Sequence, residues 1–542
     1  MKQFFNNFVG NPKNDILSGI TVALALVPEA VAFAFVAGID PLVGLYGAFM
    51  MGLITSLFGG RPGMISGATG AMAVVMVHLI QKGNEVGTAM QLENLGLSWL
   101  FITLLIVGCI QILAGLFRLG KFVRLIPHPV MMGFVNGLAI VIFLSQLGMF
   151  TRVVDGQKVW IQGSELYTMM GLVGLTMLIM WLLPKVTKVV PAALTGIIVV
   201  AALAIGLGLD VSTVGSFIRE GGGDGLQAGL PTLQWDIFNV LHTVTGHWST
   251  LFSTAFLLAA VGLIESLMTL NLIDDLTESR GSGNRECIAQ GSANLINGLF
   301  GGMGGCAMIG QSIINVNSGG RGRLSGVVAA LGLLSFILFG APLIEQIPIA
   351  ALVGVMFMVV IGTFAWSSFR IIRKIPAADA FVLIAVSAIT VWQDLAIAVI
   401  AGVIMSALKF AWDNAVRIRA RKRIKENGTK VYEIWGPLFF GSTQSFASKF
   451  DVKNDPESIE IDFVESRVSD HSAIEAVFNL VNKYEDAGKK VTLKHLSEDC
   501  KQLLYKSSAK FKEVVIEAVD DPRYHLAENP EAFDKGLSEY KF

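Results

Sequence analysis

The 542-residue chain is 53% hydrophobic and only 15% charged, where a soluble protein would carry roughly 25% charged residues, and its apolar residues form blocks long enough to cross a bilayer. Residues 1–429 hold 26 Lys and Arg against 21 Asp and Glu (+5), and residues 430–542 hold 15 against 21 (−6), so a basic membrane part and an acidic C-terminal domain are separate units. Scattered basic residues exclude a nucleic-acid-binding face, and four cysteines without CxxC spacing exclude a disulfide framework or a structural metal site.

Fourteen apolar segments follow one another before residue 412. The N-terminus carries no short apolar stretch with a cleavage site, so we expect the first segment to act as its own insertion signal. The ninth and tenth segments are short and rich in Gly, Asn and Ser, and a plain hydropathy scan would miss them. The segments are 15–37, 42–58, 64–81, 97–117, 127–150, 167–184, 189–208, 251–272, 287–300, 306–317, 324–341, 347–366, 377–392 and 395–412.

The basic residues between these segments predict the orientation in the membrane. With a cytoplasmic N-terminus, thirteen Lys and Arg fall in inside loops and only four in outside loops, as the positive-inside rule expects. The run RIRARKRIK (417–425) then marks the cytoplasmic exit of the last segment. The thirteen are Arg61, Arg118, Lys121, Arg124, Lys185, Lys188, Arg280, Arg285, Arg321, Arg323, Arg370, Arg373 and Lys374, and the four are Lys82, Arg152, Lys158 and Arg219.

A long Gly-rich loop at about 209–248 divides the segments into two groups of seven. Because seven is odd, the second group must enter the membrane from the opposite side. This arrangement predicts an inverted repeat, the architecture of many secondary transporters.

The third and tenth segments occupy corresponding positions in the two halves. They read GMISGATGAMAVVMVHLI and GGMGGCAMIGQSIINVN, small and Gly-rich at first and then helical. Broken helices that meet near mid-membrane have this pattern, and their N-termini would direct unpaired N–H groups and positive dipole ends at one cavity. Such a cavity favours an anion. The alternative is that the glycines only permit close helix packing.

Few ionisable residues lie inside the segments. Glu265, in AAVGLIESLMTLNL, is the candidate for a coupling-ion site, because a carboxylate in the bilayer is costly unless it is protonated or paired. Glu265 could take a proton or pair with Na⁺, and the hydroxyl of Thr269, one turn on, could contact either ion. The alternative is a structural carboxylate bonded to backbone.

Three further ionisable residues and one aromatic residue lie in or beside these segments. Glu29 follows Pro28, which breaks the helical ladder, so it is placed near the same cavity. The edge of Phe33, one turn on, could touch an anion, although packing is the favoured interpretation. We expect His78 to be a core histidine and Glu286 to be a first-turn residue that faces water or the helix dipole.

Four stretches resemble the SulP family of inorganic anion transporters: LVPEAVAFAFVAGIDPLVGLYGAFM, SGATGAM, GLIESLMT and FGGMGGCAMIGQSIINVNSGGRGRLSG. The resemblance covers nearly the whole chain. It implies the uracil-permease type of fold, with a seven-plus-seven inverted repeat, a core domain and a gate domain, and transport of sulfate, bicarbonate, chloride or a small carboxylate. By this resemblance the anion-binding residues are Glu29, Phe33, Thr69, Gly70, Ala71, Ile309, Gly310 and Gln311, and Glu265 and Thr269 match an Asp and a Thr that bind Na⁺ in bicarbonate-transporting relatives.

Two departures from the family pattern bear on coupling. Many relatives have Gln at the position of Glu29, and animal relatives often have Arg at the position of Gln311. This pocket therefore lacks a fixed positive charge and gains a carboxylate, and an anion beside two carboxylates would be repelled unless they were protonated or paired. We expect cation-coupled symport, with H⁺ favoured over Na⁺, because Glu in place of Asp weakens the case for direct Na⁺ binding.

Residues 430–542 have the pattern of an α/β domain. KVYEIWGPLFFGST, SIEIDFV and VTLKHL are expected strands, and HSAIEAVFNLVNKYEDAG is an amphipathic helix. This part resembles STAS domains, which implies dimer assembly and control of transport. Ser472 is the nearest match to a serine that is phosphorylated in bacterial relatives, although a capping or packing role is favoured. The expected domains are 1–425, the transporter, and 430–542, a cytoplasmic STAS domain.

The sequence therefore predicts a secondary active anion transporter that is not an enzyme and needs no cofactor beyond H⁺ or Na⁺ as coupling ion. It is expected as a homodimer in a bacterial inner membrane, with both termini cytoplasmic. Alternatives are an uncoupled exchanger or channel, a membrane anion sensor that signals through its STAS domain, and a nucleobase transporter on the same fold. The sequence does not name the anion.

Overall fold

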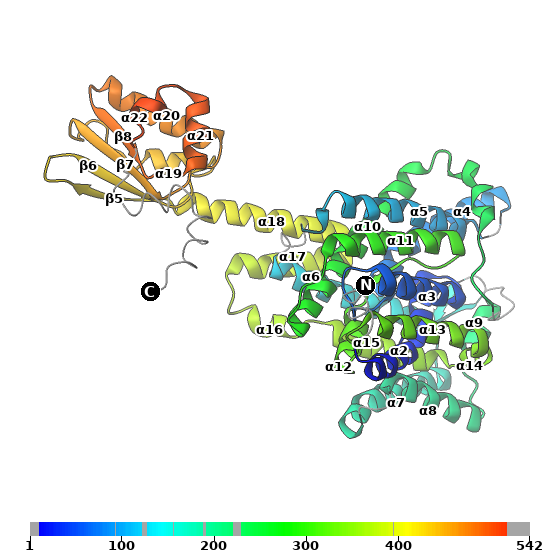
Figure 1. Ribbon diagram of the computed structural model, residues 1–542. Coiled ribbons are helices and arrows are strands. Elements are labelled where there is room, and N and C mark those ends of the chain that lie inside the picture. Colours follow the sequence, from blue (N-terminus) through cyan, green and yellow to red (C-terminus); the bar gives the residue numbers. More distant parts are fainter. Residues whose placement is uncertain are drawn as a thin grey trace. The chain divides into compact units, whose positions relative to one another are not determined.

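The computed structural model describes residues 10–92, 94–121, 127–154, 157–187, 191–220, 229–393 and 395–516. The chain divides into two compact units, with the division between Val403 and Ile404. The first unit is helical, and the second combines a sheet with helices (Figure 1).

The first half of the helical unit contains seven membrane segments and a small hairpin. Its elements are α2 (Pro12–Ala37), α3 (Pro41–Phe58), β1 (Ser66–Ala68), α4 (Gly70–Met90), α5 (Leu95–Leu116), α6 (His128–Leu147), η2 (Gly148–Phe150), β2 (Thr151–Val154), β3 (Gln157–Trp160), α7 (Ser164–Val186) and α8 (Ala192–Gly206). The connection to the second half carries α9 (Val214–Glu220), η3 (Trp235–Phe238) and η4 (Leu241–Val244).

The second half repeats this order of segments. Its elements are α10 (Trp248–Thr277), α11 (Gly283–Phe300), β4 (Gly305–Ala307), α12 (Ile309–Asn317), α13 (Arg323–Phe339), α14 (Ala341–Glu345), α15 (Ile349–Thr363), α16 (Ser367–Ile371), α17 (Ala377–Trp392) and α18 (Leu395–Val416). Each of the fourteen expected segments coincides with a helix, or with a short strand and the helix that follows it. Eight of the described helices are long and apolar enough to span a membrane, and α8, α13 and α17 are shorter apolar helices.

Local sequence fixes several helix ends. Asn11 caps α2 by accepting a hydrogen bond from the N–H of Asn14, and Pro12 occupies the first turn, where no N–H is needed. Gly38 ends α2 in the left-handed conformation, with φ of 72°. Asp40 and Pro41 then start α3 in the same way. This cap, proline and glycine pattern separates the first two segments.

Helix packing repeats between the two halves with the partners exchanged. Helix α2 packs against α12 and α13, and its counterpart α10 packs against α4 and α5. Likewise α5 packs on α11 where α13 packs on α3, and α6 packs on α17 where α15 packs on α7. This exchange agrees with the expected inverted repeat, and it separates a core group (α2–α5 and α10–α13) from a second group (α6–α8, α15 and α17).

The two broken segments meet through a short antiparallel pair of strands. Ser66 lies opposite Ala307, Gly67 opposite Cys306 and Ala68 opposite Gly305. A Cβ on Gly305 would lie 2.1 Å from the carbonyl oxygen of Gly67, so this approach requires glycine. The pairing satisfies backbone groups that would otherwise be exposed inside the membrane.

The second unit is a four-stranded sheet of order β5-β6-β7-β8 with helices packed beside it (Figure 1). β5 (Arg419–Ile424) and β6 (Lys430–Trp435) are antiparallel, and β7 (Ser458–Glu465) and β8 (Lys490–Lys494) continue the sheet in parallel. The helices are α19 (Thr443–Ala447), α20 (His471–Asp486), α21 (Glu498–Ser507) and α22 (Phe511–Val514). The expected helix and the strands at SIEIDFV and VTLKHL are present, but KVYEIWGPLFFGST is a strand only over Lys430–Trp435, because the chain turns at Gly436 and leads into α19.

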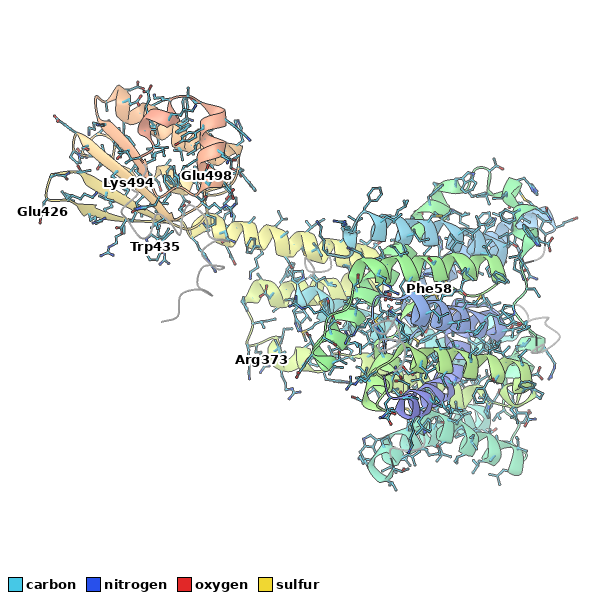
Figure 2. The ribbon with its side chains drawn as sticks, viewed as in Figure 1. Phe58, Arg373, Glu426, Trp435, Lys494 and Glu498 are labelled. Carbon is cyan, nitrogen blue, oxygen red and sulfur yellow. The ribbon has the colours of Figure 1, made fainter. Side chains whose placement is uncertain are left out.

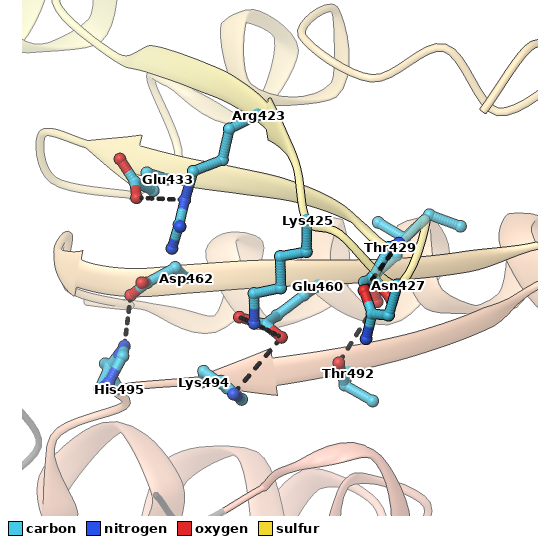
Figure 3. Close-up of polar contacts among 11 residues, drawn as sticks. Arg423, Lys425, Asn427, Thr429, Glu433, Glu460, Asp462, Thr492, Lys494 and His495 are labelled. Atoms are coloured by element: carbon cyan, nitrogen blue, oxygen red, sulfur yellow. Dashed lines mark hydrogen bonds and ion pairs between the residues drawn. The ribbon is translucent and has the colours of Figure 1, made fainter. Parts of the chain in front are cut away.

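Polar side chains from several strands link this sheet (Figure 3). Glu460 of β7 accepts hydrogen bonds from Lys425 at 2.8 Å and forms an ion pair with Lys494 of β8 at 3.4 Å. His495 and Asp462 are both buried and lie 2.7 Å apart. The expected limits of the two domains, 425 and 430, fall within the β5–β6 hairpin, because the basic run that we expected only at the membrane exit forms the edge strand β5.

Candidate anion and coupling-ion site

The site begins where two short strands turn into half-helices. Thr69 precedes α4 and Met308 precedes α12, both in extended conformation, and neither side chain caps the helix that follows. The first-turn N–H groups of Gly70, Ala71 and Ile309 are therefore available to an external acceptor. Two positive dipole ends at one place suit an anion without a basic side chain.

Glu265 lies at the junction of these half-helices. Its side chain is only 9% exposed, although it projects from the middle of α10. The thiol of Cys306, in β4, donates a hydrogen bond to Glu265 Oε2 at 2.9 Å. Thr69 completes the group, because its hydroxyl contacts Glu265 and lies 3.1 Å from Cys306 Sγ. The carboxyl group thus joins α10 to both broken segments.

Thr269 is fully buried one turn from Glu265, but its hydroxyl does not reach that carboxylate. It donates to the backbone carbonyl of Glu265 at 2.8 Å and lies 3.5 Å from the carbonyl of Ala307. The neighbouring Ser266 hydroxyl accepts from the N–H of Ala307 at 3.0 Å. Both hydroxyl groups hold β4 against α10.

Glu29 and Gln311 come together from opposite halves of the chain. Pro28 lies inside α2, and the half-buried Glu29 that follows it contacts the side chain of Gln311 in the first turn of α12. Gln311 is 1% exposed, and its Oε1 has no hydrogen-bond partner within the described residues. The structure therefore brings both residues named from the resemblance to the N-terminus of α12.

The two half-helix N-termini differ in what covers them. A Cβ on Gly70 would lie 2.8 Å from Cε1 of Phe33 and 2.9 Å from Cδ1 of Ile142, so these side chains close over the start of α4. A Cβ on Gly310 would meet no atom within 4 Å, and Gly310 is exposed. Ala71 is buried and Ile309 is half-buried, so the open side of the site lies at α12.

A second layer fixes the broken segment behind the site. Asn294 of α11 donates to the carbonyl of Gly305 at 3.0 Å and accepts from its N–H at 2.9 Å. The same amide donates to Gln111 of α5 at 2.9 Å. Buried polar groups are stable only when they are paired in this way, so Asn294 sets the position of β4.

Sequence reasoning missed two contributors and gave the wrong burial for two other residues. Cys306 and Ile142 contact the site, but a single cysteine and a single isoleucine in apolar segments carry no local signal. His78 is exposed and not in the core. Glu286 lies in the first turn of α11, as expected, but it is fully buried and does not face water: it accepts from the N–H of Gly60 at 2.7 Å and from Gln290 at 2.7 Å.

The chemistry of this arrangement is ion binding. A buried carboxyl group can hold a proton, and the half-helix N-termini can hold an anion beside it. Among the described residues, no group of three or more His, Cys, Asp and Glu side chains is placed to hold a metal ion.

Comparisons with known proteins agree over most of the chain. Residues 13–386 match the sulfate permease family, and residues 420–521 match the STAS domain. The chain is 38% identical over 497 residues to the putative sulfate transporter YbaR of Bacillus subtilis, covering 91% of this chain and 97% of YbaR. It is 30% identical over 511 residues to the bicarbonate transporter BicA of Picosynechococcus sp., covering 88% and 87% of the two chains.

Solved structures show the same fold. The transmembrane domain of a cyanobacterium bicarbonate transporter BicA superposes with a TM-score of 0.60 at 31% identity, covering 72% of this chain and 98% of that one. The overall structure of SLC26A9 superposes with a TM-score of 0.76 at 16% identity, covering 98% of this chain and 92% of that one. The expected fold class is confirmed.

Proposed function

We propose that this chain, which belongs to the sulfate permease family of anion transporters, is a secondary active symporter that couples uptake of a small inorganic anion to a cation, with H⁺ favoured over Na⁺. The chain is a multi-pass membrane transporter with a STAS domain, and not an enzyme. The coupling is what this proposal adds.

The placement of Glu265 is the single observation that carries the proposal. A carboxyl group inside the bilayer is costly in its charged form, and here it sits beside the N-termini that would hold the anion. Neutralised by a cation, Glu265 no longer repels the anion; left charged and empty, it disfavours anion entry. Each ion therefore favours the binding of the other, which is the requirement for symport.

The atoms around Glu265 support a proton more than Na⁺. Hard cations select oxygen ligands and need several of them, whereas the described side chains that bond the Glu265 carboxylate are the thiol of Cys306, 2.9 Å from Oε2, and the single hydroxyl of Thr69. The Thr269 hydroxyl, which a Na⁺ site would use, is already bonded to main-chain carbonyls. A proton needs only the carboxyl group and one acceptor.

Sulfate and bicarbonate are the anions that the named relatives suggest. Either would bind between the half-helices, with Gly310 and Ile309 on the open side and Phe33, Thr69, Gly70 and Ala71 on the closed side. Glu29, held by Gln311, would be the second proton-binding group. We place the protein as a homodimer in a bacterial inner membrane, with both termini in the cytoplasm, as the basic loops favour.

Uptake into proteoliposomes tests this function. Purified full-length protein is given radiolabelled sulfate or bicarbonate with an inward H⁺ gradient, an inward Na⁺ gradient or neither. A gradient of one pH unit is worth about 1.4 kcal/mol per coupled proton, so wild type should accumulate its anion up to about tenfold. Glu265→Gln, which keeps the shape but cannot release a proton, should show no gradient-driven accumulation.

The matched control is Glu345→Gln, because Glu345 lies at the end of α14 and pairs with Arg219 outside the site. Its uptake should equal that of wild type. Uptake that ignores both gradients and survives Glu265→Gln would instead identify an exchanger or a channel, and binding without any uptake would identify a sensor.

A further inference from the structure

Five arginines from three separate loops and the helix starts beside them line one cavity of the helical unit. Arg61 follows α3, Arg280 lies in the α10–α11 connection with Arg285 in the first turn of α11, and Arg321 lies in the α12–α13 connection with Arg323 as the first residue of α13. The cavity measures about 620 Å³. The positive-inside rule predicts that these arginines lie on the cytoplasmic side, but it does not explain why they lie around one cavity.

Two of the five arginines are part of the protein interior. Arg61 is 8% exposed and Arg323 is 6% exposed. Arg323 donates to the carbonyls of Ser56 at 2.8 Å and Leu57 at 3.2 Å, and to Gly59 at 2.6 Å. It therefore fixes the end of α3, where the loop that carries Arg61 begins.

Arg61 is anchored but incompletely paired. Its guanidinium contacts Thr277, donates to Ser279 at 2.8 Å and lies 3.2 Å from Asp274. Its Nε is buried and has no hydrogen-bond partner within the described residues. Burial lowers the pKa of Arg61, Asp274 opposes this, and the positive charge of Arg321 lowers it further.

The other three arginines form the accessible part of the cavity. Arg285 is exposed, and its Nε donates at 2.8 Å to the carbonyl of Phe58, the last residue of α3, labelled in Figure 2. Arg280 and Arg321 are exposed, and within the described chain neither makes an ion pair. Their charges are therefore free to bind a ligand.

The nearby carboxylates only partly offset this charge. Glu278 is the one acidic residue among the described residues that line the cavity. Asp15, Asp274 and Glu286 lie behind the lining, and each accepts backbone N–H groups: Asp15 from Arg321 and Gly322, Asp274 from Gly281, and Glu286 from Gly60. These bonds hold the loops in place and leave a cationic cavity.

We propose that this arginine cavity is a binding site for a phosphate-bearing ligand, separate from the transport site. Every basic residue of the described lining is Arg and none is Lys. The planar guanidinium group matches phosphate oxygens with two parallel hydrogen bonds, which an ammonium group cannot do. The volume lies in the range of small-molecule sites, so it suits a soluble phosphate compound or the headgroup of an anionic phospholipid.

The position of the cavity gives its occupant a route to the transport site. Val316, near the C-terminal end of α12, lines the cavity. Ile309, at the other end of the same helix, belongs to the candidate anion site. Seven residues of helix separate them by about 10 Å. A ligand that ties the three loops together would hold α12 in place.

Thermal unfolding of the full-length protein, followed by tryptophan fluorescence, tests the site. Inorganic pyrophosphate is the soluble probe, titrated in detergent at constant ionic strength. A ligand that binds only the folded state raises the unfolding temperature saturably. Arg280→Gln with Arg321→Gln should weaken the response about tenfold or more, because two charge-assisted contacts are lost.

Arg370→Gln with Arg373→Gln is the matched control, because these exposed arginines, one in the last turn of α16 and one just after it, lie outside the cavity (Figure 2 labels Arg373). The unfolding temperature of this control should rise with pyrophosphate as it does in wild type. Glu265→Gln should also bind pyrophosphate like wild type, so that a failure of the proposed transport function and a failure of this site can be told apart. Equal responses from the two double variants, or no response of wild type to any probe, would overturn the proposal.

A second arm distinguishes the two sources of phosphate. The same titration is made in nanodiscs of phosphatidylcholine and of phosphatidylglycerol. If the ligand is a lipid headgroup, phosphatidylglycerol should raise the unfolding temperature of wild type but not of the Arg280/Arg321 variant, and it should suppress the pyrophosphate response. If the ligand is soluble, the pyrophosphate response should be the same in both lipids.

Discussion

Gly70 and Gly310 lie in the first turns of the two half-helices, α4 and α12, but in opposite surroundings. Gly70 lies under Phe33 and Ile142, and Gly310 faces open space. The asymmetry means that a methyl group has a different effect at each position. At Gly70 it overpacks a closed contact, and at Gly310 it projects into the volume that we assign to the anion.

Substitution by alanine at each glycine tests this reading. Gly70→Ala should destabilise the protein by about 1–3 kcal/mol, the usual effect of overpacking, and should lower the unfolding temperature. Gly310→Ala should unfold like wild type but raise KM for the anion. Thermal unfolding and uptake kinetics measure the two effects, and an unchanged KM in Gly310→Ala would place the anion elsewhere.

The residues of the site were only partly predictable. Glu265 stood out because a carboxylate in an apolar segment is rare, and Glu29 because it follows an intrahelical proline. Cys306 could not be found in the same way, since a small apolar-like residue suits any buried position. Its role depends on strand pairing between residues far apart in the sequence, and that pairing leaves no local trace.

At the scale of elements, the three-residue strand β4 depends on Asn294. This one amide bonds both the N–H and the carbonyl of Gly305. Removing it leaves two buried backbone groups unpaired, and each costs about 1–3 kcal/mol. No other side chain among the described residues bonds either group.

Asn294→Ala should therefore lower the unfolding temperature markedly and abolish uptake, whereas Asn294→Asp should recover only the bond from the Gly305 N–H. Ser292→Ala is the control on the same helix, because its hydroxyl bonds only the carbonyl of Ile288. Calorimetry with uptake assays measures both. Near-normal stability in Asn294→Ala would mean that β4 holds its place without this bond.

Helices and half-helices were predictable to different degrees. The apolar lengths, prolines and glycines near residues 12, 28, 38 and 41 fixed the first two helices. The stretches Ser66–Ala68 and Gly305–Ala307 are too short for a periodic pattern, so their Gly content indicated a break but not a strand. The first-turn position of Glu286 was predictable, but its burial was not, because its partner Gly60 lies 226 residues away in the sequence and a polar helix start resembles a solvent-facing one.

At the scale of the whole molecule, the C-terminal unit carries its own buried ionic centre. Asp455 is 5% exposed, accepts from Tyr432 at 2.7 Å and from Tyr484, and pairs with Lys430. Burial tends to raise the pKa of Asp455, but the hydrogen bonds from Lys430, Tyr484 and Tyr432 outweigh it and lower the pKa. The ionised form is therefore the native one.

This centre should make the C-terminal unit sensitive to acid. A carboxyl group whose pKa is lowered by folding adds stability above its unfolded pKa of about 3.9, and that stability is lost as the pH falls through the folded pKa. Hydrogen exchange of β7 in the full-length protein should show protection that is constant near neutrality and declines below about pH 4. Asp455→Asn should lose about 3 kcal/mol of protection at neutral pH and flatten the acid decline. If protection of β7 in Asp455→Asn fell with pH as steeply as in wild type, the acid sensitivity would come from other groups.

The broad organisation followed from the sequence, because bilayer thickness and charge asymmetry act on long stretches. The seven-plus-seven grouping, the α/β tail and its main strands are all of this kind. The convergence of Arg61, Arg280 and Arg321 was not predictable, since each belongs to a different loop. The edge strand β5 was not predictable, because a run of basic residues is typical both of an edge strand and of the cytoplasmic end of a membrane segment.

The pairing of β1 with β4 has a consequence for how the protein is made. Ser66 and Ala307 are 241 residues apart in the chain, and a ribosome adds about 5–20 residues per second. The first broken segment must therefore wait about 10–50 seconds for its partner, and unpaired backbone is not tolerated in lipid. During that interval the unpaired backbone of the first half must be shielded from lipid by the insertion machinery or by another helix. A chain truncated before Gly305 should therefore be degraded by membrane proteases.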